Sequence, residues 1–185
     1  MPQVVDIEKK KTYTLEDYLK LPEGAPYQLV KGELVMSPSP SPSHQEFLKL
    51  LGVRLVNFAE GRGLGKVYFA PIDIYLSDID VYQPDIVFIS KDRLHIIGEK
   101  RIEGVPDLVV EILSPATAYY DLRVKKDRYA VAGVKEYWIV DPIEKVIEVY
   151  INEGGEFRLV SQARTRGEIS SVIVNGFKIN LEELS

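Results

Sequence analysis

The chain has 185 residues, of which 45% are hydrophobic and 28% charged, as in an ordinary globular protein. Its 23 Lys and Arg residues against 28 Asp and Glu residues give a net charge of −5. This balance argues against broad electrostatic adhesion to nucleic acid or to anionic membranes, although local basic patches remain open. Without cysteine, the sequence excludes disulfides, thiolate zinc sites and cysteine nucleophiles.

The first residues, MPQVVDIEKKK, lack the continuous apolar segment of a signal peptide. No run of the sequence approaches the roughly 20 apolar residues that span a bilayer. We therefore expect a cytoplasmic protein with no membrane partner. The length suits a single domain over residues 1–185, with a core at about 12–150 and a β-rich tail at about 146–185.

The N-terminal third predicts a helix, a hairpin and a second helix. Thr14 caps a short helix, and a Pro-Glu-Gly sequence from residue 22 closes it. The strands at 27–30 and 33–36 flank Lys31-Gly32, where glycine supplies the positive φ that a tight hairpin requires.

Alternating Ser and Pro over residues 37–43 predict an extended surface loop, which acts either as a connector or as a recognition motif. Ser43 is then the expected cap of the second helix. Its apolar face comprises Phe47, Leu50, Leu51, Leu55 and Phe58.

The middle of the chain predicts a sheet. Successive strands are expected at residues 66–70, 72–76 and 81–89, with a turn at 77–80. Residues 107–113 are almost wholly apolar, as expected for a central strand covered on both faces.

A third helix is expected from Thr117 to Gly133, followed by a strand at residues 134–140. The remaining apolar segments predict antiparallel hairpins, at residues 146–150, 157–160 and 172–179. A turn is expected at 152–155, where Asn-Glu-Gly-Gly occurs.

Two strand-like runs each contain one carboxylate, Asp85 and Glu111. If these residues lie on neighbouring strands about 4.8 Å apart with side chains on one face, they can share a cation. Asp107 is too far from Glu111 to share a cation with it in place of Asp85, because four residues of one strand span roughly 13 Å. Either acid alone could instead lie solvated at a strand end.

Glu111 is surrounded by Val109, Val110, Ile112 and Leu113, and an unpaired buried carboxylate costs several kcal/mol. It therefore requires a metal ion, a lysine or an arginine as a partner. On a helical wheel, Ala118, Leu122 and Tyr129 define the inward face of the third helix.

Lys125 lies near that inward face and can either reach Glu111 or extend to solvent. Asp121, one turn earlier, is placed to orient Lys125. Arg123, Lys125, Lys126 and Arg128 also form a basic cluster, which is either a nucleic-acid contact or a solvated helix face.

An ordered set of motifs resembles the restriction-endonuclease-domain family of bacterial proteins, within the PD-(D/E)XK nuclease superfamily. The set comprises Pro84-Asp85, Glu111-Ile112-Leu113-Ser114-Pro115, Thr117, Asp121, Lys125, Tyr129, Gly133-Val134 and the Glu-Tyr-Trp-Ile-Val-Asp-Pro run from residue 136. The likeness also includes residues 27–33 and His44, and it extends to about Tyr150.

The resemblance implies an α/β (α+β) fold, restriction-endonuclease-like, with a central mixed β-sheet flanked by helices and a β-rich C-terminal extension. It also implies a site for Mg²⁺ or Mn²⁺, held by Asp85, Glu111 and the main-chain carbonyl of Ile112. The superfamily lysine two residues after the second acid is Leu113 here, and its role passes to Lys125. The family carboxylate near the first hairpin is Gln28 here, which leaves Glu33 as the candidate extra acid.

The function that follows is metal-dependent endonuclease cleavage of nucleic acid, with DNA expected, in which Lys125 orients water or offsets charge. Glu33 and His44 are auxiliary candidates, and His44 equally suits a structural role beside the helix cap. By analogy, a homodimer or higher homo-oligomer is expected.

One alternative is a non-catalytic oligomerisation or binding module that retains the fold. Its expected signature is a metal-free ion-pair cluster of Asp85, Lys125 and Glu111. A metal-dependent hydrolase of another substrate would use the same ligands.

Overall fold

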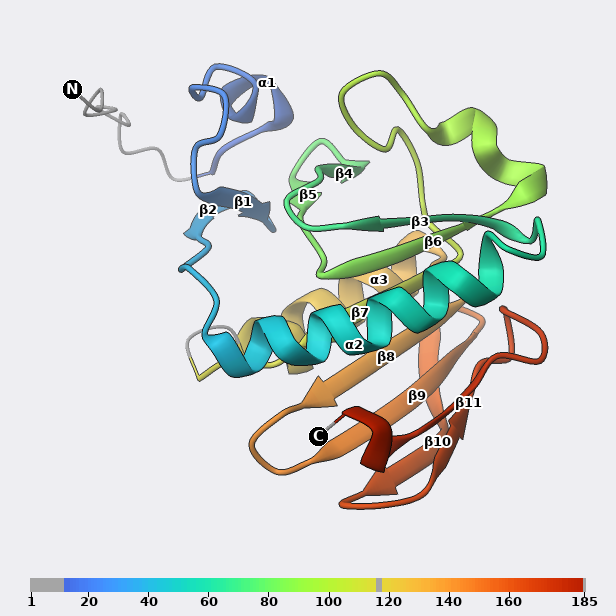
Figure 1. The fold of residues 1–185 in the computed structure, drawn as a ribbon. Helices are drawn as coiled ribbons and strands as arrows, with labels where there is room; N and C mark the ends of the chain where they lie inside the picture. The colour runs from blue at the N-terminus through green and yellow to red at the C-terminus, as the bar shows by residue number, and fades with distance from the viewer. Residues whose placement is uncertain (1–11, 116–117, 185) are drawn as a thin grey trace.

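A six-stranded mixed sheet forms the centre of the fold in the computed structural model, which describes residues 12–115 and 118–184 (Figure 1). The strand order is β10-β9-β8-β7-β6-β3, with β7 and β8 parallel and the other neighbours antiparallel. The strands are β3 (Gly65–Phe69), β6 (Ile86–Ser90), β7 (Leu108–Ile112), β8 (Glu136–Asp141), β9 (Val146–Glu153) and β10 (Glu156–Arg164). The predicted fold class is confirmed, and β7 is central as its apolar sequence indicated.

Two smaller sheets complete the β-structure. A four-stranded sheet has the order β2-β1-β5-β4, comprising β1 (Tyr27–Val30), β2 (Glu33–Met36), β4 (Ile74–Ser77) and β5 (Asp80–Tyr82). The predicted hairpin is confirmed, with Lys31 and Gly32 at φ 51° and 77° in its turn. Near the C-terminus, β11 (Glu168–Ser170) pairs with β12 (Lys178–Asn180).

Helices cover both faces of the large sheet (Figure 1). The helical segments are α1 (Leu15–Tyr18), α2 (Pro42–Ala59), η1 (Lys91–Ile96), η2 (Tyr120–Lys125), α3 (Lys126–Ala132) and η3 (Leu181–Leu184). On one face, Phe47, Leu51 and Leu55 of α2 pack in a cluster with alternate residues of β6, β7 and β8. On the other face, Tyr129 of α3 packs with Val109 and with residues of the smaller sheet. None of the described helices is long and apolar enough to cross a membrane.

The predicted cap of α2 was wrong by two residues. Ser41, rather than Ser43, accepts the hydrogen bond from the His44 N–H, and Pro42 occupies the first helical position. Proline suits that position because its φ is already helical and its missing N–H would have no helical partner. The extended Ser-Pro loop is therefore shorter than expected, and His44 belongs to the first turn of the helix.

The strand predicted over residues 81–89 is divided between two sheets. Tyr82 ends β5 in the smaller sheet, and Ile86 begins β6 in the larger one. Pro84 has no N–H to donate to a ladder, so the chain leaves one sheet and enters the other around it. This break sets Asp85 immediately before β6.

The third helix differs from the regular α-helix that the wheel assumed. Its first residue was predicted to be Thr117, which lies outside the described residues. The segment η2 is a π-helix, which changes the angular position of successive side chains before α3. Leu122, expected inward, is 41% exposed, whereas Asp121 is 1% exposed. Gly133 ends the helix in the left-handed conformation, at φ 98°, as predicted.

The hairpin predicted at residues 172–179 was also misplaced. Its strands are β11 and β12, and most of the apolar run between them forms the connection. The N–H groups of Val172 and Ile173 donate to the buried carboxylate of Glu136 on β8, at 2.7 and 2.9 Å. These two N–H groups therefore bond a side chain of the large sheet instead of a strand partner.

Candidate functional site

The antiparallel register of β6 and β7 brings Asp85 and Glu111 together. Ile86 pairs with Val110, so one step further along the same register Asp85 lies opposite Glu111. Directly opposite residues of an antiparallel pair share one face of the sheet. The Ile112 N–H donates to Asp85 Oδ2 at 2.6 Å, which fixes that carboxylate at the sheet's end. The arrangement supposed from sequence, with both acids on one face, is present.

Glu111 is buried, and its Oε1 accepts two hydrogen bonds from the third helix. Lys125 Nζ lies 3.0 Å away and Tyr129 Oη lies 2.8 Å away. Tyr129 is itself held by edge-to-face contact with Tyr82, with ring centroids 5.3 Å apart. The carboxylate is thus oriented by two donors that are themselves packed.

Lys125 reaches inward to Glu111 and does not extend to solvent, since its side chain is only 4% exposed. Its Nζ also lies 3.0 Å from Oδ1 of Asp121, four residues earlier, as the sequence suggested. Both residues belong to the π-helical segment η2. Lys125 is therefore held between two buried carboxylates, one on the sheet and one on its own helix.

His44 connects α2 to the same site. Its Nε2 lies 3.2 Å from Asp85 Oδ1, and its buried Nδ1 makes no hydrogen bond with the described residues. Burial alone would lower the pKa of His44, but the hydrogen bond and charge of Asp85 outweigh it and raise that pKa above 6.5. His44 therefore acts as a hydrogen-bond donor to Asp85 near neutral pH.

Burial and the neighbouring carboxylates together set the pKa of Glu111. Burial raises the pKa of Glu111 to about 8, against the opposing effect of Lys125, and the charges of Asp121 and Asp85 add to the rise. For Lys125, the two neighbouring carboxylates outweigh burial and raise the pKa above its ordinary range, so its ammonium remains protonated. At neutral pH the site therefore combines a protonated Lys125 with a carboxyl group of Glu111 that binds its proton more readily than usual.

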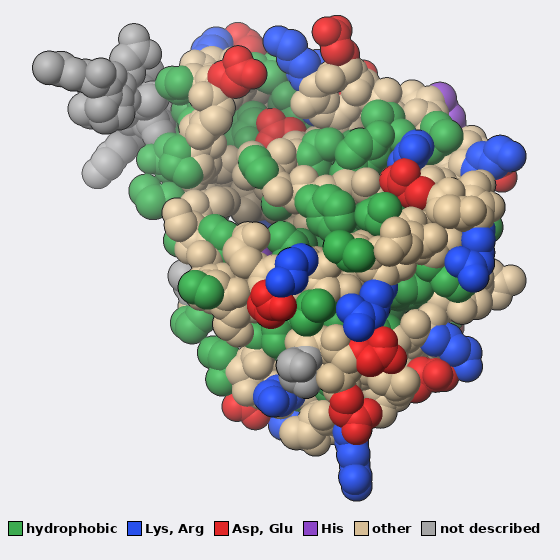
Figure 2. All heavy atoms as spheres, viewed as in Figure 1, with side chains coloured by type: hydrophobic (Ala, Val, Ile, Leu, Met, Phe, Trp, Pro, Cys, Tyr) green, Lys and Arg blue, Asp and Glu red, His purple; other side chains and the backbone are tan. Residues whose placement is uncertain are grey.

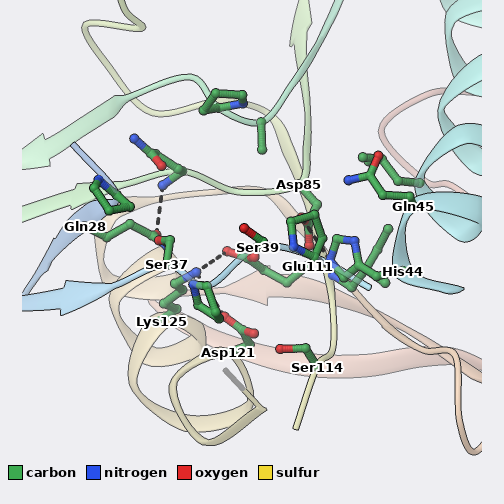
Figure 3. Close-up of a pocket in the computed structure, with 18 of the residues that line it drawn as sticks. Gln28, Ser37, Ser39, His44, Gln45, Asp85, Glu111, Ser114, Asp121 and Lys125 are labelled. Carbon is green, nitrogen blue, oxygen red and sulfur yellow. Dashed lines mark hydrogen bonds and ion pairs between the residues drawn. The ribbon is translucent and has the colours of Figure 1, made fainter. Parts of the chain in front are cut away.

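These side chains line a cavity of about 380 Å³ between the two sheets and α2. The cavity floor comprises Asp85, Glu111, Ile112, Asp121 and Lys125, and one wall comprises His44, Gln45 and Leu48 of α2. The opposite wall comes from residues 24–26, Gln28 and residues 37–40. Figure 3 shows His44 beside Asp85 and Glu111, with Gln28 and Ser37 on the other side.

A family model described as "Putative restriction endonuclease", and named Uma2, matches residues 15–182. The chain belongs to the Uma2 family. Among solved structures, it is similar to a putative nuclease belonging to DUF820 from Anabaena variabilis ATCC 29413. That comparison gives a TM-score of 0.76 at 19% identity, covering 92% of this chain and 96% of the other, and it establishes the shared fold. No curated protein matches.

Most of the site residues that the family resemblance predicted line the cavity, but Glu33 does not. Asp85, Glu111, Lys125, His44 and the Ile112 main chain meet at one cavity. Glu33 is exposed on β2 and does not line the cavity.

Gln28, which replaces the expected carboxylate, does line the cavity, donating to Ser37 at 2.8 Å and accepting from the Gln83 N–H at 2.9 Å. Asp107 ion-pairs with Arg93 and Lys135 and does not line the cavity. This agrees with the sequence argument, which excluded Asp107 as a cation-binding partner of Glu111.

Three contributors to this Uma2 site were not assigned a role from sequence. Tyr129 was placed on the inward face but not recognised as a donor to Glu111. Gln83 and Ser39 line the cavity from segments that were considered only as strand and loop. For Tyr129 the signal was available, because a buried tyrosine hydroxyl on the helix that carries Lys125 needs an acceptor. For the other two, no local pattern carries the information.

Proposed function

We propose that this Uma2 protein is a metal-dependent endonuclease that hydrolyses phosphodiester bonds of nucleic acid, with DNA as the expected substrate. The observation that carries the proposal is the placement of Asp85 and Glu111 opposite each other at one cavity, with Lys125 Nζ 3.0 Å from Glu111. Two carboxylates and a nearby ammonium are the groups that phosphoryl chemistry requires for charge stabilisation. Membership of a family described as putative restriction endonucleases supports the same reading.

The donor set fits a hard divalent cation. Asp85, Glu111 and the Ile112 carbonyl offer oxygen atoms, which Mg²⁺ and Mn²⁺ prefer. The pKa of Glu111 is raised to about 8, chiefly by burial and further by the charges of Asp121 and Asp85, and a bound cation would favour its ionised form.

Among residues 12–115 and 118–184 there is no cluster of three or more acids or histidines arranged for a metal. Two carboxylates completed by water and a substrate phosphate are nevertheless a common Mg²⁺ arrangement. These residues would therefore hold the ion together with substrate.

When bound, a divalent cation would supply Lewis acidity, neutralising phosphate charge and making water a better nucleophile. Lys125, whose raised pKa keeps its ammonium protonated, serves as a fixed positive charge for the transition state and not as a general base. Asp121 positions Lys125 at 3.0 Å. His44 Nε2 holds Asp85 at 3.2 Å and can carry a proton at that atom.

A second candidate, a non-catalytic binding or oligomerisation module, is favoured by one specific observation. Lys125 pairs with both Glu111 and Asp121, each at 3.0 Å, so the buried ammonium is already satisfied by protein groups. This differs from the expected signature, because Asp85 pairs with His44 at 3.2 Å. A hydrolase of another substrate would need the same residues.

Mn²⁺ binding by calorimetry tests the proposal without knowledge of the substrate. Wild type should bind Mn²⁺, and Asp85→Asn, which halves the charge of the opposed carboxylates, should bind at least about tenfold more weakly. The titration is repeated with a short DNA duplex, because phosphate can supply missing ligands. If neither protein binds Mn²⁺ with or without DNA, the non-catalytic reading stands.

Cleavage assays provide the second test. Asp85→Ala and Lys125→Ala should each abolish Mn²⁺-dependent cleavage while circular dichroism shows a folded protein. Lys178→Ala is the matched control, because its side chain is 59% exposed and pairs with Glu168 at the surface. Cleavage that survives both site substitutions would rule the mechanism out.

A further inference from the structure

The acidic groups of the site are recessed within the cavity and do not stand on an open face. The exposed fraction of the side chain is 15% for Asp85, 4% for Glu111 and 2% for Asp121. A phosphodiester must therefore enter the cavity to reach them. A cavity of about 380 Å³ is near the lower end of the range for small-ligand sites, which suits a nucleotide-sized group.

The walls carry almost no positive charge. Among the described residues that line the cavity, Lys125 is the single lysine or arginine, and it lies on the floor. Helix α2 also carries Lys49 and Arg54 outside the cavity lining, where they pair with Glu46 and Glu183 at 2.7 and 3.1 Å. On the face shown in Figure 2, lysine and arginine side chains are interspersed with acidic ones. The described residues therefore form no basic track along that face to hold a duplex backbone, whose binding proteins neutralise many phosphates.

The walls instead present amides, hydroxyls and apolar surface. Gln45 and Ser39 line the walls with an amide and a hydroxyl. Gln28 and Gln83 donate to Ser37 and Asp73, and each side-chain NH₂ has a second hydrogen that it can donate to a ligand. Pro26, among the apolar lining residues, provides a flat surface. Hydrogen bonds to exposed base edges and contacts with base faces are how proteins bind unpaired nucleotides.

We propose that the substrate is single-stranded nucleic acid, one nucleotide of which enters the cavity so that its phosphate reaches Asp85, Glu111 and Lys125. This inference rests on the proposed endonuclease function. It assigns the neutral walls to the sugar and base, and the charged floor to a single phosphate. The same walls would exclude a continuous duplex. A paired helix is too wide to enter the cavity, so its phosphates would not reach the recessed floor.

The test compares a labelled single strand with a blunt duplex of the same sequence, using the full chain with saturating Mn²⁺. The kcat/KM for the single strand should exceed that for the duplex by at least about tenfold, because the duplex must first unpair. The pair is run in deoxyribonucleotides and in ribonucleotides, and a preference for the single strand in either sugar supports the proposal. Faster cleavage of the duplex in both would overturn it while leaving the endonuclease function intact. Cleavage of neither form would overturn the function itself.

Salt dependence gives an independent readout. A single strand held through one or two phosphates should show a slope of log kcat/KM against log salt of about −0.7 to −1.4 over roughly 50–200 mM salt. A slope steeper than about −4 would indicate an extended backbone contact of the kind that duplex binding requires, and would contradict the proposal.

A pair of tryptophan substitutions tests the cavity directly. Ser39→Trp places a large ring in the wall of the cavity, whereas Ser43→Trp places it on exposed helix surface outside the lining. Ser39→Trp should lower kcat/KM for the single strand by at least about tenfold, with unchanged thermal unfolding and unchanged Mn²⁺ binding. Ser43→Trp should retain wild-type cleavage. Undiminished single-strand cleavage by folded Ser39→Trp would show that the nucleotide does not occupy this cavity.

Discussion

The buried ammonium of Lys125 should contribute substantially to the free energy of unfolding. Its side chain is 4% exposed and lies 3.0 Å from both Glu111 and Asp121, so Lys125→Met leaves two buried acids without their cation. Removing one partner of a buried ion pair typically costs about 3–5 kcal/mol of unfolding free energy. That loss lies within the roughly 5–15 kcal/mol of a typical domain, so the variant should remain folded at room temperature.

Denaturant unfolding at neutral pH measures this loss. Neutralising the acids as well, in Lys125→Met with Glu111→Gln and Asp121→Asn, should recover much of the stability. If Lys125→Met alone is as stable as wild type, the ammonium is not buried between these acids.

The lowered pKa of Asp107 should make the free energy of unfolding depend on pH. Burial acts to raise its pKa, but hydrogen bonds from Lys135, the Ser90 N–H and Arg93 outweigh burial and hold the pKa below 3.8. The folded protein therefore binds this proton less readily than the unfolded chain. The ionised group stabilises the fold fully above about pH 5, and this contribution is lost as the pH falls through and below about 4.

Asp107→Asn should lower the unfolding free energy at neutral pH and make it fall less steeply below about pH 4. The measurement is a series of denaturant titrations from neutral to acidic pH, with the exposed Asp92→Asn as control. If the unfolding free energy of Asp107→Asn falls below about pH 4 as steeply as that of wild type, ionised Asp107 does not stabilise the fold in this way.

At the scale of elements, the π-helical segment η2 determines which side chains face Glu111. Asp121 and Lys125 are both buried within it, although Leu122 is 41% exposed. The hydrogen bonds of a π-helix span one more residue than those of an α-helix, so deleting exposed Arg123 should restore α-helical spacing. Because Tyr129 and Ala130 anchor α3 in the core, the residues before the deletion would rotate, and Asp121 would leave the site.

The Arg123 deletion should therefore keep its helical circular dichroism but lose at least about tenfold in Mn²⁺-dependent cleavage, as expected when a positioning group is displaced. Arg123→Ala is the control, because it removes the side chain without changing the register. Full activity in the deletion variant would show that the π-helical geometry is dispensable.

Sequence patterns predicted most elements because their signals are local. A continuous apolar run located β7, hydrophobic periodicity located α2, and Lys31-Gly32 located the first hairpin. The pairing of Asp85 with Glu111 was a supposition, based on one carboxylate in each of two apolar strands, and the register of β6 and β7 agrees with it. The errors arose where tertiary structure decides. The π-helix has no periodicity that distinguishes it from an α-helix, and the connection between β11 and β12 is fixed by distant Glu136.

At the scale of the whole molecule, Glu136 attaches the C-terminal segment to the large sheet. The carboxylate is fully buried on β8 and accepts from Trp138 Nε1, Ser171 Oγ and the N–H groups of Val172 and Ile173. Val174, Phe177 and Leu184 then pack in the same core cluster as α2. The tail is therefore part of the core, and its attachment stabilises the face opposite the site.

Glu136→Gln should lower the unfolding free energy by at least about 2 kcal/mol, because an amide NH₂ facing the two main-chain N–H groups leaves them unsatisfied. Fluorescence of Trp138, the single tryptophan, follows the loss in a denaturant titration. Glu148→Gln is the matched control on β9, where the carboxylate is only partly buried. Equal effects of the two substitutions would contradict a special role for Glu136.

Most of the cavity is assembled from two separate stretches of the chain, to which Ala70, Pro71 and Gln83 add. Its reactive floor comes from residues 85–125, whereas two of its walls come from residues 24–48. Most of the interactions that hold Glu111, Asp121 and Lys125 are made within the first stretch. The wall segment can therefore diverge in sequence and length with little effect on these three side chains. Exchanging residues 37–40 between family members would be the simplest way to transfer selectivity from one protein to another.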